Sequence, residues 1–177
     1  MIRYAVVGAG WISQEAFLPS VSQSGNSCVT AIVSGDSAKA NKLAAFYGIP
    51  HVVDYGEYDS LLSRDIVDAV YIALPNSMHA DYAIRAARAG KHVMVEKPIS
   101  AHKADAERLI ATAQQHPKQV FGGMFQMRVE PRYQKIRKLI QGGELGEIVR
   151  INWIITDWFR TEAYYASGGW RATWKGS

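Results

Sequence analysis

Short apolar runs alternate with amphipathic helical patterns along most of the chain, and this alternation limits the possible folds more than any other feature. Because the runs are almost continuously apolar, each is expected to be a strand covered on both faces. The runs cover residues 4–7, 29–33, 51–53, 67–74, 92–95 and 120–127. Helical patterns lie between them, over residues 11–23, 37–47, 58–62, 77–89 and 100–115. The alternation predicts an α/β fold with a doubly wound parallel sheet and crossover helices.

Capping residues mark the ends of the expected helices. The expected N-terminal caps are Asp36 or Ser37, Asn76 with Ser77, and Ser100. Gly48 and Gly90 are expected to end the second and fourth helices, and Pro19 disturbs the first helical pattern.

The pattern changes after residue 130. Pro131 begins a further helical pattern that ends at Gln141, and residues 149–156 then alternate apolar and polar side chains. This alternation predicts a half-covered strand of an antiparallel sheet. We therefore expect a dinucleotide-binding domain over residues 1–124 and the beginning of a substrate or oligomerisation domain over residues 125–177.

The expected second domain is rich in aromatic side chains. Four of the five tryptophans follow residue 150. One strand cannot make a sheet, and so short a segment cannot bury these rings by itself. Either another chain covers them, with a homo-oligomer through the strand region as one possibility, or the sequence is cut short. We prefer the second interpretation.

Composition excludes several classes of function. The formal net charge is +4, but the Lys and Arg residues are scattered, which argues against a nucleic-acid surface and fits an anionic small ligand. Cys28 is the single cysteine, so neither an intrachain disulfide nor a cysteine metal site is expected. The histidines show no metal-binding spacing, and no metal is expected. No apolar stretch approaches the roughly 20 residues of a membrane span. We expect a cytoplasmic protein.

A glycine-rich segment joins the first strand to the first helix and predicts a dinucleotide site. Its sequence is Gly8-Ala9-Gly10-Trp11-Ile12-Ser13. Gly8 permits a tight turn, and Gly10 lets the backbone approach a pyrophosphate at the helix N-terminus. Ser13 is small enough for close packing of helix and strand. The segment indicates a Rossmann-type fold, although a glycine-rich turn without a ligand remains the alternative.

The end of the second strand is expected to select the cofactor. Ser34 can donate a hydrogen bond to a 2′-phosphate, and Lys39 lies about one helical turn further on and can supply positive charge. Asp36 argues for NAD, unless it is only a helix cap. We prefer NADP over NAD.

Polar residues also follow the fourth and fifth strands, at the edge where parallel sheets bind ligands. Pro75 fixes a turn, Asn76 offers a donor and an acceptor, and His79 begins the next helix, where it is alternatively a plain surface histidine. Glu96 can hold a ribose hydroxyl and Lys97 can hydrogen-bond a substrate oxygen during hydride transfer. Neighbouring strand residues point to opposite faces, so these two need not pair. The alternative is a charged strand end that meets water.

Several stretches together resemble the glucose–fructose oxidoreductase/inositol dehydrogenase/rhizopine catabolism (Gfo/Idh/MocA) oxidoreductases. The matching stretches are VVGAGWIS, AIVSGDSAKANKLAAFYGIP, VYIALPNSMHADYAIRAARAGKHVMVEKPIS and LIQGGELGEI. The PN..H and GKHV..EKP stretches are more specific than the glycine turn. The resemblance implies an NAD(P)-dependent oxidoreductase of a sugar-like or polyol-like substrate. Family members are about twice as long, so the resemblance also implies that most of the substrate domain is absent.

The resemblance implies a role for each matching residue. Gly8, Gly10 and Ile12, with Trp11 in the same turn, are implied to line the pyrophosphate site, and Ser34 and Lys39 to hold the 2′-phosphate. The cofactor is implied to be bordered by Pro75, Asn76, His79 and Glu96. Lys97 is implied to be the catalytic lysine, and Arg171, in a Gly169-Trp170-Arg171 stretch, to lie near the substrate. The alternative function is a cofactor-binding module without turnover that acts as a sensor or an assembly partner.

Overall fold

The computed structural model describes residues 1–156, 159–167, 169–171 and 173. Two aromatic residues of the expected second domain, Trp158 and Trp174, lie outside the described residues. The contacts divide the chain into two compact units, of which the first contains Met1–Met124 and the second begins at Phe125.

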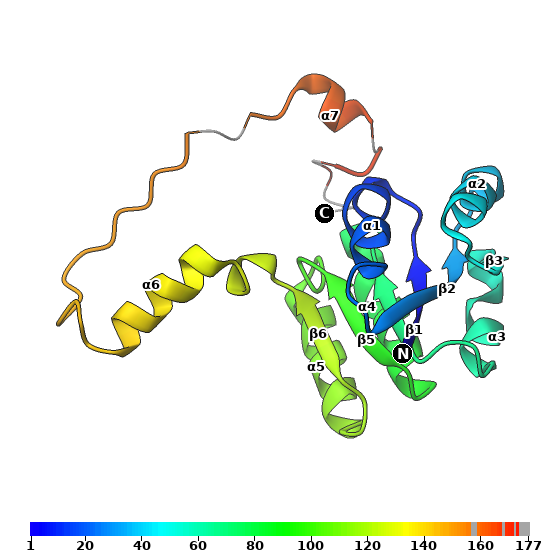
Figure 1. Cartoon of the computed structure of the whole chain (residues 1–177), viewed down its shortest axis with the longest axis horizontal. Helices are drawn as coiled ribbons and strands as arrows, with labels where there is room; N and C mark the ends of the chain where they lie inside the picture. The colour runs from blue at the N-terminus through cyan, green and yellow to red at the C-terminus, as the bar shows by residue number, and fades with distance from the viewer. Residues whose placement is uncertain (157–158, 168, 172, 174–177) are drawn as a thin grey trace. The chain divides into compact units, whose positions relative to one another are not determined.

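The first unit is built on the predicted parallel sheet (Figure 1). Its six strands lie in the order β3-β2-β1-β4-β5-β6, and every neighbouring pair is parallel. The strands are β1 (Ile2–Val7), β2 (Ser27–Val33), β3 (His51–Val53), β4 (Ala69–Ile72), β5 (His92–Glu96) and β6 (Phe121–Met124). The fourth and sixth strands are shorter than the apolar runs that predicted them. The order reverses between β1 and β4, and a crevice forms at such a point in doubly wound sheets.

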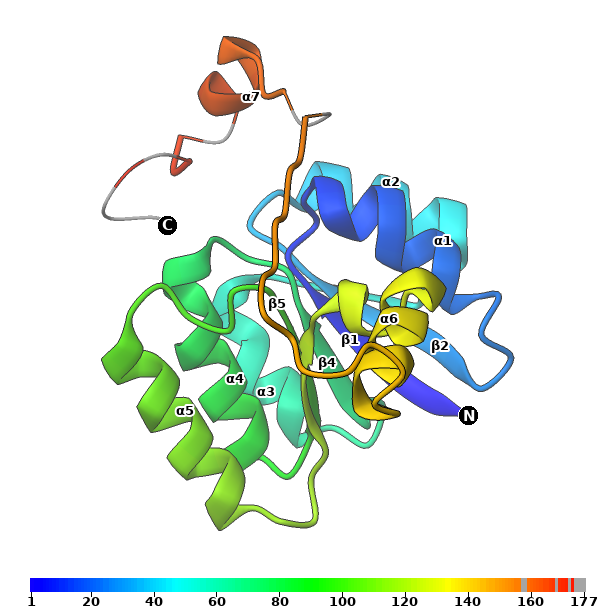
Figure 2. The ribbon, with the colours of Figure 1, turned by 90° about the vertical axis from the view of Figure 1, so that its left-hand side faces the viewer.

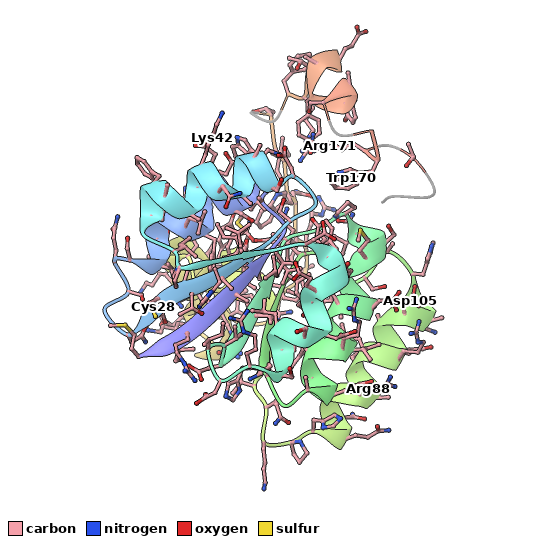
Figure 3. All side chains as sticks on the ribbon, turned by 90° about the vertical axis from the view of Figure 1, so that its right-hand side faces the viewer. Cys28, Lys42, Arg88, Asp105, Trp170 and Arg171 are labelled. Atoms are coloured by element: carbon pink, nitrogen blue, oxygen red, sulfur yellow. The ribbon has the colours of Figure 1, made fainter. Side chains whose placement is uncertain are left out.

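Helices cover both faces of the sheet, as the apolar strands require (Figure 2). One face packs against α1 (Leu18–Val21) and α2 (Ser37–Tyr47). The other face packs against α3 (Tyr58–Ser63), α4 (His79–Arg88) and α5 (Lys103–Gln115). Burial on both faces explains why β4 reads as a continuous apolar run, since all four of its residues are buried. Cys28 in β2 is a free cysteine (Figure 3).

The first helical segment differs from a regular α-helix. Ser13–Phe17 is wound as a π-helix, and α1 follows it directly. Pro19 lies in the first turn of α1. Because proline has no backbone N–H, it interrupts the α-helical hydrogen bonding of the preceding turn. The disturbance expected at Pro19 is therefore present, and it takes the form of a wider turn.

Some predicted helix caps are confirmed and others are wrong. Asp36 caps α2, since its side chain accepts a 2.9 Å hydrogen bond from the Lys39 backbone N–H, and Gly48 ends this helix with a φ of 67°. The predicted caps of α4 and α5 are not caps. Asn76–Met78 forms a short 3-10 turn before α4. Ser100 accepts from the backbone N–H of His102, within the turn before α5, and so stabilises that turn instead of the helix.

The second unit contains α6 (Pro131–Gln141) and α7 (Glu162–Ala166). The helix after Pro131 was predicted, but the strand over residues 149–156 was not borne out, because these residues are not a strand. A strand needs a partner for its backbone hydrogen bonds, and the described part of this unit supplies none. Val149 and Ile154 are consequently 93% and 84% exposed. Across the described residues, no helix is both long and apolar enough to cross a membrane.

Candidate cofactor site

In the turn after β1, the surrounding protein leaves no space for a side chain at Gly8 but leaves open space at Gly10. Gly8 has a φ of 100°, and a Cβ added there would lie 2.5 Å from the carbonyl oxygen of Ala73. The fold itself therefore requires glycine at this position. Gly10 is exposed, and a Cβ there would approach nothing closer than the same oxygen at 4.0 Å. Packing does not require glycine at position 10, so the space above it is available to a ligand.

Ser13 links this turn to the helix that follows. The side chain is fully buried, and its Oγ donates a 2.6 Å hydrogen bond to the Gly8 carbonyl. The first helical hydrogen bond runs from the Gln14 N–H to the Gly10 carbonyl at 3.2 Å. The N–H groups of the intervening residues face the start of the helix, where anions are attracted. Trp11 lies in this turn and is 69% exposed, whereas Ile12 is half-buried.

The segment after β2 contains one buried hydroxyl and an ion pair. Ser34 is 6% exposed, and its Oγ accepts a 3.1 Å hydrogen bond from the Asp36 N–H. The Lys39 Nζ lies 3.4 Å from the Asp36 carboxylate. The pKa of Asp36 is lowered, mainly by the hydrogen bond from the Lys39 backbone and to a smaller degree by the charges of Lys39 and Lys42. Lys42 is exposed on α2 (Figure 3). The segment thus offers cations, but a carboxylate competes for Lys39.

The segment after β4 presents an amide at the same edge. Pro75 and Asn76 are half-buried, and the Pro75 carbonyl accepts a 2.9 Å hydrogen bond from the Met78 N–H. Within the described chain, the Asn76 side chain makes no hydrogen bond. Its donor and acceptor therefore remain available to a ligand.

His79 lies beneath this segment rather than on the surface. Its side chain is 1% exposed, which rules out the plain surface histidine that the sequence left open. The ring Nδ1 lies 2.7 Å from the Pro98 carbonyl oxygen, and Nε2 lies 2.8 Å from the Leu74 carbonyl oxygen. Both nitrogens are therefore occupied by backbone groups, and the ring connects the segments that follow β4 and β5.

Glu96 and Lys97 have opposite environments, since the Glu96 side chain is buried and the Lys97 side chain is exposed. Glu96 is 8% exposed, and its Oε1 accepts a 2.6 Å hydrogen bond from the Tyr71 hydroxyl. The Lys97 backbone N–H donates to Oε2 of Glu96 at 3.2 Å. The Lys97 side chain is exposed, and in the described structure its ammonium group has neither an ion pair nor a hydrogen bond. The Lys97–Pro98 peptide bond is cis.

Tyr71 belongs to this site, although the sequence did not single it out. It lies in the middle of β4, and its ring stacks on Phe17 with centroids 3.8 Å apart and planes 5° apart. Burial raises the pKa of Tyr71, and the hydrogen bond to Glu96 raises it further. The available signal was one phenol hydroxyl inside an otherwise aliphatic run, because a buried hydroxyl needs a partner.

The register brings these segments to one edge. Val7 of β1 pairs with Val33 of β2 and with Ile72 of β4, and Ile72 in turn pairs with Val95 of β5. The turns and side chains described above follow these residues directly. All the predicted site residues except Arg171 lie in the first unit. None of the described residues forms a group of three or more His, Cys, Asp or Glu that could hold a metal.

Arg171 lies in the second unit and interacts with α7. Its Nη1 donates a 2.7 Å hydrogen bond to the Ser167 hydroxyl and a 3.2 Å hydrogen bond to the Tyr164 carbonyl. Its guanidinium lies 4.4 Å from the centroid of the Tyr164 ring. These contacts hold Arg171 within its own unit.

The strand order and the glycine turn at the reversal point define a dinucleotide-binding Rossmann domain. Residues 2–124 match the family model described as "Oxidoreductase family, NAD-binding Rossmann fold". The chain therefore belongs to the Gfo/Idh/MocA oxidoreductase family. The family and the fold that the sequence predicted are both confirmed.

Relatives of known description share this domain. The chain is 32% identical over 158 residues to D-xylose 1-dehydrogenase [NADP(+)] of Haloarcula marismortui, covering 88% of this chain and 43% of the relative. It is 37% identical over 147 residues to dTDP-3,4-didehydro-2,6-dideoxy-alpha-D-glucose 3-reductase of Streptomyces violaceoruber, covering 83% and 42%. A 3-ketoreductase of Actinomadura kijaniata, solved with NADP and TDP-benzene, superposes with a TM-score of 0.72 at 34% identity, covering 80% and 42%. The chain thus spans less than half the length of these relatives.

Proposed function

We propose that the chain binds NADP(H), with NAD(H) as the second choice, as the cofactor-binding part of a sugar or polyol oxidoreductase. One observation carries this proposal. An open glycine turn, an unpartnered amide at Asn76, a buried carboxylate at Glu96 and an unpartnered ammonium at Lys97 follow strands that end at one edge of the sheet. Doubly wound parallel sheets bind dinucleotides outside the carboxyl ends of their strands, with the pyrophosphate at the glycine turn.

The adenine half of the cofactor is assigned to the segments after β1 and β2. Gly8, Gly10, Trp11 and Ile12 would surround the pyrophosphate. Ser34 and Lys39 would hold the 2′-phosphate, a role in keeping with relatives that are named for NADP or were solved with it. Asp36 opposes this preference, since its carboxylate lies 3.4 Å from the Lys39 ammonium.

The nicotinamide half is assigned to the segments after β4 and β5. Pro75 and Asn76 would border the ring, with His79 beneath them, and Glu96 would accept a hydrogen bond from the ribose. Burial beside the Tyr71 hydroxyl holds the Glu96 carboxylate in one orientation.

Lys97 is assigned the proton transfer. The bound cofactor accepts or donates a hydride at the substrate carbon. When an alcohol is oxidised, its C–H bond yields the hydride, its O–H bond yields a proton, and a carbonyl remains. On oxidation the neutral Lys97 amine would accept this proton and become an ammonium group, and on reduction the ammonium group would return the proton to the carbonyl oxygen. Since the Lys97 side-chain nitrogen has no hydrogen bond or ion pair in the described chain, it is available to this oxygen.

Residues 125–177 are proposed to be the first part of a substrate domain, in which Arg171 lies near the substrate. Support comes from exposed apolar side chains that a further segment or a second copy would cover, such as Ile151, Trp153 and Phe159 at 75%, 59% and 86% exposure. A cytoplasmic location and a homo-oligomer through this region stay predictions from the sequence. The same exposed apolar side chains support the second candidate function, a cofactor-binding module without turnover that uses them to contact a partner.

Two measurements test these functions. Titration with NADPH, followed by its fluorescence, tests binding. Turnover of a panel of sugars and polyols is then compared between this chain and a chain extended beyond residue 177. Binding by both with turnover only by the extended chain supports the oxidoreductase, whereas binding without turnover by either supports the module. Lys97→Ala is expected to abolish turnover and to leave NADPH binding intact, and an unchanged rate would remove Lys97 from the mechanism.

A further inference from the structure

The carboxyl ends of β4 and β5 separate beyond their last paired residues. The β4–β5 register ends at Ile72 and Val95. After this point Ala73 hydrogen-bonds to Val7 of β1, while Glu96 pairs with Met124 of β6. In the described structure, no backbone hydrogen bond joins residues 73–78 to residues 96–100. The sheet therefore does not by itself fix the distance between the segment that carries Asn76 and the segment that carries Lys97.

The His79 side chain connects these two segments. Its ring contacts the Leu74 carbonyl oxygen at 2.8 Å on one side and the Pro98 carbonyl oxygen at 2.7 Å on the other. Leu74 lies two residues before Asn76, and Pro98 directly follows Lys97. A carbonyl only accepts hydrogen bonds, so the ring donates through each nitrogen that carries an N–H, which is one nitrogen in a neutral imidazole and both in an imidazolium. The two nitrogens point in divergent directions from a rigid ring, so one side chain reaches both carbonyl oxygens.

We propose that His79 is a positioning residue that sets the spacing between Asn76 and Lys97, and thereby shapes the nicotinamide half of the site without touching the cofactor. This inference rests on the proposed function. The role proposed for His79 affects only the nicotinamide half of the site, because the segments after β1 and β2 are held by their own contacts. Those contacts include the hydrogen bond from the Gly8 N–H to the Val33 carbonyl at 2.9 Å and the one from the Ser34 N–H to the Val53 carbonyl at 3.0 Å.

The test compares two ligands across two variants. NADPH occupies both halves of the site, whereas 2′,5′-ADP carries only the adenine half with its phosphates. His79→Phe keeps a flat ring at this position and removes both ring nitrogens. We expect it to weaken NADPH binding about tenfold, the equivalent of one lost hydrogen bond, and to change 2′,5′-ADP binding by less than about twofold. His102→Phe is the matched control, since His102 is an exposed residue before α5, and it is expected to change neither.

A second pair of variants keeps the inference testable if His79→Phe does not fold. His79→Gln retains an amide donor at the same place. If His79 acts through the segment that carries Asn76, the change in NADPH Kd caused by His79→Gln is expected to be smaller in the Asn76→Ala background than in the unmodified chain. A general loss of structure would instead make the effects of the two substitutions additive. Additive effects, equal losses for NADPH and 2′,5′-ADP, or no loss at all would each overturn the role of His79. If the unmodified chain binds neither ligand, the proposed function fails as well.

Discussion

Substituting the two outer glycines of the turn after β1 separates what the fold needs from what the cofactor needs. Gly8→Ala places a Cβ 2.5 Å from the Ala73 carbonyl oxygen, at a φ of 100°. That oxygen belongs to the backbone, and the same residue is tied to β1 by a 2.9 Å hydrogen bond from its N–H to the Val7 carbonyl. The clash therefore cannot be relieved by turning a side chain.

The magnitudes follow from these contacts. A non-glycine residue in an unfavourable backbone region costs about 1–3 kcal/mol, and overpacking adds about 1–3 kcal/mol. Gly8→Ala is thus expected to lower the free energy of unfolding by about 2–6 kcal/mol. At position 10, the nearest atom to an added Cβ is the Ala73 carbonyl oxygen at 4.0 Å, which is an ordinary contact distance. The effect of Gly10→Ala on stability is expected to stay within about 1 kcal/mol, in the stabilising direction, because alanine restricts the unfolded chain.

Cofactor affinity is expected to respond in the opposite order. A methyl group at position 10 occupies the space assigned to the pyrophosphate, so Gly10→Ala is expected to weaken NADPH binding by about tenfold to 100-fold, the equivalent of an overpacking cost of about 1–3 kcal/mol. Urea unfolding followed by tryptophan fluorescence measures stability, and NADPH titration measures affinity. A Gly10→Ala protein that binds NADPH like the unmodified chain would refute the position assigned to the phosphates. A Gly8→Ala protein of unchanged stability would refute the described turn.

Three further predictions concern side chains around the site and the base of the sheet. Tyr71→Phe removes the hydroxyl that donates to the buried Glu96 carboxylate. Urea unfolding is expected to show a free energy of unfolding lower by about 2 kcal/mol. A change near zero would mean that Glu96 has another partner. Asp36→Asn keeps an oxygen to cap α2 but removes the charge that pairs with Lys39; NADPH titration is expected to show tighter binding and NADH titration little change, and equal effects on both cofactors would contradict the role of Lys39. Arg3 lowers the pKa of Asp68 from 3.8 to about 2, so this carboxylate stabilises the fold above its unfolded pKa and the contribution is lost as the pH falls through the folded value. Asp68→Asn is therefore expected to lower the urea midpoint at pH 7, and a difference that persists below pH 2 would argue against the ion pair.

The sheet was predictable because strands that are buried on both faces have almost continuously apolar sequences. Val70 and Ile72 of β4 are buried on one face and Tyr71 on the other, so the strand reads as one apolar run. The cap of α2 was also predictable, since the contact from Asp36 to Lys39 spans only three residues. Local chemistry of this kind does not depend on the rest of the fold.

Contacts between distant residues were not predictable in the same way. The hydrogen bond from Tyr71 to Glu96 spans 25 residues, and the contact from His79 to Pro98 spans 19. Each depends on where two strands end relative to each other, which no local pattern encodes. The alternation over residues 149–156 failed for a related reason, because a strand exists only when a partner is present to accept its hydrogen bonds.

The central claim is that a dinucleotide lies across the carboxyl edge of the parallel sheet. Amide NMR spectra of the chain with increasing NADP test it most directly, because they report on every segment at once. The account predicts shifts concentrated at residues 8–13, 34–39, 76–79 and 96–97, with little change at the opposite edge near Asp68 and Lys91. Saturable binding that leaves these four segments unchanged, or that shifts the opposite edge instead, would contradict it.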